Sequence, residues 1–112
     1  MTTTPPWGTP TSGGTYPPEP GPPMGFFLLV EQLTGSGNTA IWRIDPDPIP
    51  AGGDRSGARA AALQLARTFS PHHPYSPQGR TVYRISDDAY VVVVPGMTKT
   101  FHFRVSVGER LG

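Results

Sequence analysis

The segment AYVVVV, residues 89–94, constrains the fold more than any other part of the chain. Valine is β-branched and favours strands, and successive side chains of a strand point to opposite faces of the sheet. Four consecutive valines therefore present apolar groups to both faces, which is typical of a central strand. A strand of this kind needs a covering layer on each side.

Four other segments have the composition of strands. Residues 26–33 (FFLLVEQL), 39–44 (TAIWRI), 80–86 (RTVYRIS) and 100–107 (TFHFRVSV) are rich in β-branched and aromatic residues. Turn formers lie between them: TGSGN after the first, Asp87-Asp88 before the valine run and PGMTK after it. The three prolines of DPDPIPAGG, residues 45–53, predict an irregular crossover that is neither helix nor strand.

Residues 54–69 contain the one helical pattern. Asp54 is suited to cap the first turn by accepting from its free amides, and Ser70-Pro71 ends the helix. One apolar stripe recurs at helical spacing and consists of Ala58, Ala61, Ala62, Leu65, Ala66 and Phe69. The order strand-strand-helix-strand-strand-strand predicts an α+β domain, with a single antiparallel sheet of about five strands and one helix packed on one face.

The chain divides into two parts of different composition. Eight of its 15 prolines lie within the first 23 residues, where no periodic apolar face is present. Residues 1–24 are therefore predicted to form a disordered Pro/Gly-rich tail, and residues 25–112 one small α+β domain. Within the tail, PPEP and PGPP resemble ligands of proline-binding grooves, although a solvated tether is the simpler interpretation.

Composition excludes several classes of protein. The chain has no cysteine, which rules out disulfides, thiolate metal sites and a cysteine nucleophile. Its net charge of +1 is too balanced to attract nucleic acid or an anionic membrane by its bulk field. No apolar run reaches the roughly 20 residues needed to cross a bilayer, and MTTTPPWGTP lacks the features of a secretory signal. We therefore expect a cytoplasmic protein.

Side-chain alternation divides the predicted sheet into two faces. If the aromatic side of each strand lies under the helix, Phe101, Phe103, Val105 and Val107 belong to the core. The opposite face then combines apolar and basic side chains, which are the candidate ligand or interface residues: Ile41, Arg43, Val82, Arg84, His102 and Arg104. The outer side of the valine run lies among them. We expect a second subunit or the chain's own tail to cover such an apolar strip.

The patterns that signal catalysis or metal binding are all incomplete. Adjacent His72 and His73 point apart in an extended loop, and no second histidine lies at metal-ligand spacing. No serine lies in Gly-x-Ser-x-Gly, and GGDRSG lacks the lysine of a phosphate-binding loop. Asp87-Asp88 offers too few oxygens for calcium. The sequence therefore predicts no catalytic residue, no metal site and no cofactor.

These observations favour a small non-catalytic protein-interaction module that associates with itself as a homodimer or with another protein, and that does not bind membranes. One alternative is single-stranded nucleic-acid binding through Arg43, Arg84 and Arg104, because arginines on a sheet can contact phosphates. Another is a small enzyme or an accessory subunit that uses His72, His73 or His102. That role would require the histidines to share a concave pocket.

Overall fold

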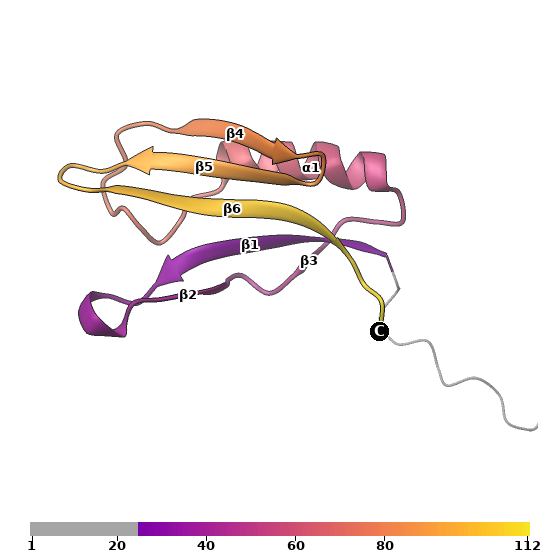
Figure 1. The fold of residues 1–112 in the computed structure, drawn as a ribbon, viewed down its shortest axis with the longest axis horizontal. Coiled ribbons are helices and arrows are strands. Elements are labelled where there is room, and N and C mark those ends of the chain that lie inside the picture. Colours follow the sequence, from indigo (N-terminus) through magenta and orange to yellow (C-terminus); the bar gives the residue numbers. More distant parts are fainter. Residues whose placement is uncertain (1–24) are drawn as a thin grey trace, which may run out of the picture.

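The computed structural model describes residues 25–112, so the predictions for residues 1–24 lie outside the described part of the chain. The predicted α+β class and the order of the main elements are confirmed (Figure 1). The elements are β1 (Phe26–Thr34), a 3-10 turn η1 (Gly37–Thr39), β2 (Ile41–Ile44), β3 (Ile49–Pro50), α1 (Arg55–Thr68), β4 (Thr81–Ser86), β5 (Ala89–Pro95) and β6 (Thr100–Glu109).

One antiparallel sheet contains all the strands of the described residues, in the order β2-β1-β6-β5-β4, with the short β3 also paired to β1. The central pair joins the first and the last strand of the sequence, with Leu28 opposite Val107 and Val30 opposite Val105. The valine run forms β5, which pairs with β6 on one side and with β4 on the other. Its predicted position in the interior of the sheet is therefore correct.

The proline-rich crossover was predicted to contain no strand, and this prediction is wrong at Ile49 and Pro50. These two residues form β3 and pair with Leu28 and Phe27 of β1. Pro50 has no backbone N–H to donate. Because β3 lies on the edge of the sheet, no strand on its outer side requires that donor, and proline is tolerated in such positions. The short strands β2 and β3 thus share the same edge of β1.

The helix lies behind β4 and β5 in the view of Figure 1 and contacts β6, β5 and β1. The Asp54 side chain caps its first turn by accepting from the backbone N–H of Gly57 at 2.7 Å. Three alanines, Ala58, Ala62 and Ala66, are completely buried against the sheet. Small side chains at these positions let the helix backbone approach the strands closely, whereas the predicted stripe residue Ala61 is exposed.

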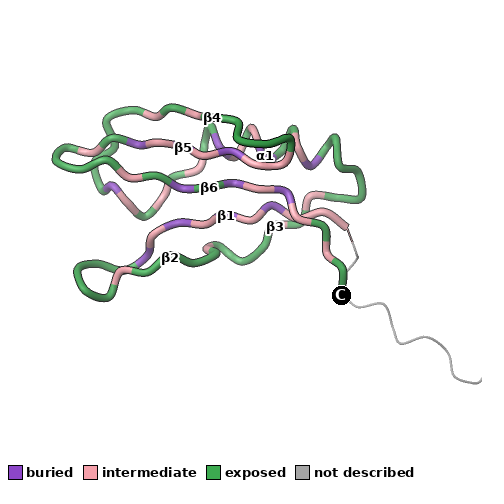
Figure 2. Tube along the Cα trace, viewed as in Figure 1, coloured by how far each residue is buried: buried purple, intermediate pink, exposed green. Residues whose placement is uncertain are grey.

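The core lies between α1 and the three middle strands, as the alternating buried positions of β1, β5 and β6 show (Figure 2). Its largest fully buried side chain is Phe103, opposite Val92 in the ladder. The Phe69 ring, at the end of α1, lies 5.4 Å from the Phe103 ring. Val105 and Val107 are buried as predicted, whereas Phe101 is only partly buried.

Candidate interaction surface

The sheet face opposite α1, called the open face below, has no covering layer within residues 25–112. Antiparallel partners point to the same side of a sheet, so the ladder registers assign each side chain to a face. The larger side chains of the open face come from five strands: Phe27, Leu29, Glu31 and Leu33 of β1, Trp42 and Ile44 of β2, Tyr83 of β4, Val91 and Val93 of β5, and His102 and Arg104 of β6.

Four of the six candidate residues do not belong to the open face. Ile41 and Arg43 of β2 are opposite Thr34 and Gln32, two residues buried on the helix side. The predicted placement of this strand is therefore inverted, and Trp42 and Ile44 point to the open face instead. The assumption that the aromatic side always lies under the helix fails here, because β2 is an edge strand beyond the reach of α1.

The same inversion occurs in β4. Val82 is opposite the buried Val92, and Arg84 is opposite the buried Tyr90, so both lie on the helix side of the sheet. Tyr83, predicted to point to the core, is opposite Val91 on the open face. Only His102 and Arg104 are on the face where the sequence placed them.

The centre of the open face is nearly neutral. Arg104 Nε lies 3.0 Å from Glu31 Oε1, and the two residues are direct partners across the β1–β6 ladder. Both side chains are about half exposed, so this ion pair contributes little to folding stability. Its consequence for binding is that Arg104 already has an anionic partner. An external phosphate can therefore bind Arg104 only if the ion pair between Arg104 and Glu31 breaks.

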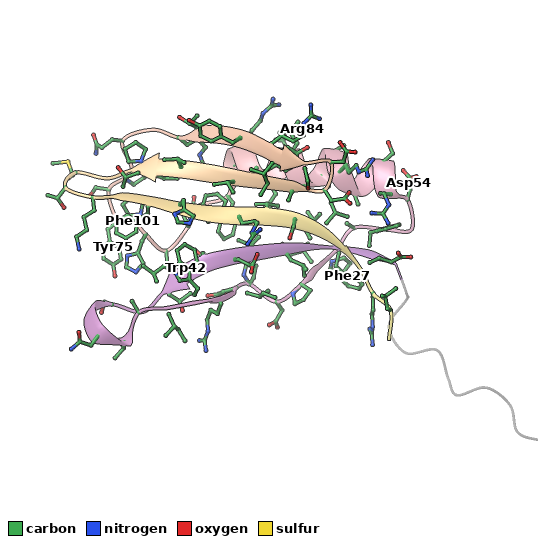
Figure 3. The ribbon with its side chains drawn as sticks, in the orientation of Figure 1. Phe27, Trp42, Asp54, Tyr75, Arg84 and Phe101 are labelled. Atoms are coloured by element: carbon green, nitrogen blue, oxygen red, sulfur yellow. The ribbon has the colours of Figure 1, made fainter. Side chains whose placement is uncertain are left out.

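An aromatic pair lies beside this ion pair. The Trp42 ring reaches over β1, and its centroid is 4.8 Å from that of His102 on β6 (Figure 3). These rings line a hollow of about 500 Å³, together with Ile44, Val91, the Glu31–Arg104 pair and Arg43 at its border. A shallow hollow with an aromatic wall and a paired charge can receive an apolar or aromatic side chain of a partner.

The open face exposes several large apolar side chains to solvent. Trp42, Ile44 and Tyr83 are 51%, 47% and 54% exposed. The outward valines Val91 and Val93 are only partly buried, although Val92 and Val94 on the other side of β5 are completely buried. On this face, apolar side chains of β2, β1, β5 and β4 flank the polar His102 and Arg104 of β6, and exposed apolar groups beside polar ones are a common property of binding sites.

The two adjacent histidines support the fold rather than a shared site. Gln32, 2% exposed, accepts from the His72 backbone N–H at 2.8 Å and donates to the Asp45 carbonyl at 2.6 Å. The His72 ring lies 2.8 Å from Asp45 Oδ2. The His73 ring is 2.6 Å from the carbonyl oxygen of Gly35. These bonds join the loop after α1 to the β1–β2 hairpin.

The three histidines are not gathered in one pocket. His73 stacks on Phe101 and lines a hollow beside the β5–β6 turn. His102 lines the different hollow on the open face. His72 is held by Asp45 at the sheet edge. The geometry expected of an acid–base site, with the histidines around one cavity, is therefore not present in the described residues.

Sequence reasoning missed the role of the β4–β5 turn. Asp88 accepts from Arg59 Nε at 2.7 Å and from Arg55 Nη1 at 3.1 Å, which ties this turn to the start of α1. The hydrogen bond from Arg59 is the main cause that lowers the pKa of the Asp88 carboxyl, with partial desolvation opposing it. Two arginines one helical turn apart, upstream of a double-aspartate turn, were the sequence signal for this contact.

Within residues 25–112, no three histidine, aspartate or glutamate side chains gather in a way that could hold a metal ion. No helix in this part of the chain is long and apolar enough to cross a membrane. Comparisons with models of known protein families, with characterised proteins and with solved structures found no significant match.

Proposed function

We propose that this protein is a non-catalytic interaction module that forms a homodimer through the open face. The observation that carries this proposal is the uncovered apolar surface around Val91, Val93, Trp42 and Tyr83. Burial of apolar area is the main favourable term in most protein associations. The helix covers the other side of the same strands, so only a partner in trans or residues 1–24 can cover this side.

The size of the open face is sufficient for a dimer. Five strands about 4.8 Å apart and about seven residues long cover roughly 24 × 24 Å, or about 600 Å² on each subunit. Two such faces bury on the order of 1,200 Å², which is at the lower end of stable specific interfaces. Aligned packing of two sheets face to face is a common arrangement.

The charge of the open face also suits a second copy. Glu31 and Arg104 neutralise each other, so two identical faces do not repel through an excess of one sign. In a two-fold arrangement each copy can also offer its carboxylate to the guanidinium of the other. The net charge of +1 adds little repulsion between the subunits.

Sedimentation equilibrium over a concentration series tests the dimer. We expect the wild type to dimerise and Val93→Glu to remain a monomer, because dimerisation would bury an unpaired carboxylate. Tyr83→Ser, a change at an exposed position, should weaken the dimer without affecting the fold. Ala61→Glu is the matched control, since it adds the same charge to the exposed side of α1.

Two results would remove this proposal. One is a wild type that is strictly monomeric at about 500 µM, well above the Kd expected for a functional interface. The other is a dimer that Val93→Glu and Tyr83→Ser leave unchanged while their circular dichroism matches that of the wild type, because the subunits would then meet elsewhere.

A further inference from the structure

A second surface lies at the free edge of β4, away from the open face. β4 is the last strand of the sheet, and no strand within residues 25–112 pairs with its outer side. Between this edge and α1 is a hollow of about 260 Å³, lined by Leu63 and Arg67 of the helix, Val82 and Arg84 of β4, and Tyr90 of β5. This is where the corrected face assignment places Val82 and Arg84.

The chemistry of this groove is apolar at its base and cationic at its rim. Leu63 and Val82 are partly buried hydrophobic residues that pack against the core, and Tyr90 is almost completely buried. Arg67 and Arg84 are exposed, and Arg84 lies at the outer edge of β4 (Figure 3). The groove therefore offers an apolar hollow between two guanidinium groups.

Arg67 and Arg84 differ from several other arginines of the domain. Arg55 and Arg59 bind Asp88, Arg104 binds Glu31, and Arg80 donates to the Ala66 and Phe69 carbonyls at the end of α1. Among residues 25–112, no carboxylate pairs with either groove arginine. Their positive charges are thus open to a carboxylate from another molecule.

The backbone of the groove suits an extended peptide. The β4 edge spans Thr81–Ser86, about 20 Å at 3.4 Å per residue, and contains neither proline nor lysine, which commonly protect such edges. The contact of Arg59 with Asp88 bounds one end of the groove, and that of Arg80 with the Ala66 carbonyl bounds the other. A bulge between Arg84 and Ser86 ends the regular ladder.

We propose that the β4–α1 groove binds an acidic peptide in extended conformation, which adds a strand to the sheet. Val82 and Arg84 are two residues apart and point to the same side. A paired peptide therefore places an apolar residue opposite Val82 and a glutamate or aspartate opposite Arg84, also two residues apart. The backbone ladder supplies affinity, and the hollow and the arginines supply specificity.

This site is separate from the proposed dimer surface and can be tested independently of it. The probe is the capped peptide Thr-Glu-Thr-Val-Thr-Glu, which has a carboxylate two residues away from valine on both sides. It is titrated into the ¹⁵N-labelled full chain while amide chemical shifts are recorded. We expect shifts concentrated in β4 and in the second half of α1.

Three comparisons identify the contacts. A peptide with lysine in place of glutamate should bind at least about tenfold more weakly, because it faces Arg67 and Arg84 with the same charge. A peptide N-methylated at alternate residues, which cannot complete the ladder, should also lose affinity. Arg84→Gln should weaken the glutamate peptide about fivefold or more, whereas the matched control Arg110→Gln, whose side chain donates to the Gly112 carbonyl, should leave the affinity unchanged.

The proposal is overturned if the glutamate peptide produces no shifts at about 1 mM, or if the lysine peptide binds equally well. Shifts centred on Trp42 and His102 would place binding on the open face instead. In the Val93→Glu variant, which cannot dimerise through the open face, shifts of the β4 amides that still depend on protein concentration without peptide would show that a second copy occupies the edge, and would also overturn the proposal.

Discussion

The close contact between α1 and the sheet predicts a marked difference between two adjacent alanines. Ala62 is completely buried between the helix axis and the strands, whereas Ala61 is exposed to solvent. Leucine at either position has a favourable helix propensity. Ala62→Leu therefore tests how tightly the helix packs, and Ala61→Leu is its control within the same turn.

The magnitude follows from the lack of space around Ala62. Three added carbon atoms have to displace the helix or distort neighbouring side chains, and overpacking of this kind costs about 1–3 kcal/mol. Ala61→Leu should change the free energy of unfolding by less than about 0.5 kcal/mol, as expected for exposed positions. For a domain stabilised by about 5–10 kcal/mol in total, the cost at Ala62 is a large fraction.

Urea unfolding followed by circular dichroism measures this difference. With an m value of about 1 kcal/mol per molar urea, Ala62→Leu should lower the midpoint by about 1–3 M, and Ala61→Leu should leave it nearly unchanged. Equal midpoints for the two variants would refute the packing of α1 through its alanine stripe. An Ala61→Leu variant that is the less stable of the two would show that the helix is rotated from the position described.

Two other predictions concern polar contacts. Gln32→Leu should destabilise the fold by about 1–3 kcal/mol, because it leaves the His72 N–H and the Asp45 carbonyl without their partner; a urea midpoint equal to that of the exposed-site control Gln64→Leu would contradict this. Arg59 lowers the pKa of Asp88 in the folded state. The ionised Asp88 carboxylate therefore contributes fully to folding stability above the unfolded pKa of about 3.9, and this contribution is lost as pH falls through the lower folded pKa. Melting temperature should therefore decrease less between about pH 5 and pH 2 in Asp88→Asn than in the wild type, and parallel curves would show that the carboxylate does not contribute.

The middle of the sheet could be predicted from sequence because two layers act on it. In β6, Phe103, Val105 and Val107 alternate with polar residues, and all three are buried. In α1 the apolar spacing and the cap at Asp54 determine both the start of the helix and its inner side. Periodicity is informative here because one side of each element is buried and the other is not.

The edge strands lack this information. The main contacts of α1 are with β1, β5 and β6, so residues of β2 are not sorted by burial and those of β4 are sorted only at the partly buried Val82. Every residue of β2 is exposed, whichever face it points to. The phase of such a strand depends on the register with its neighbour, which a tight turn and a bulge can shift by one residue. A one-residue shift moves all its side chains to the other face. Trp42 and Tyr83 are placed on the wrong face by the sequence because their aromatic side is assumed to lie under the helix, which does not bury these two strands.

The corrected phases also change the balance between the functional hypotheses. Trp42, Ile44 and Tyr83 move to the open face, which makes it more apolar, while Arg84 leaves it. Arg43 is opposite Gln32 on the other side of the ladder, although it still borders the hollow beside Trp42. Arg104 remains, but Glu31 neutralises its charge. The three arginines considered for nucleic-acid binding therefore do not form one basic surface, and the face that remains is suited to burial against another apolar surface. The same correction brings Arg84 beside Arg67 at the edge of the sheet, where the domain has concentrated positive charge next to an unpaired strand.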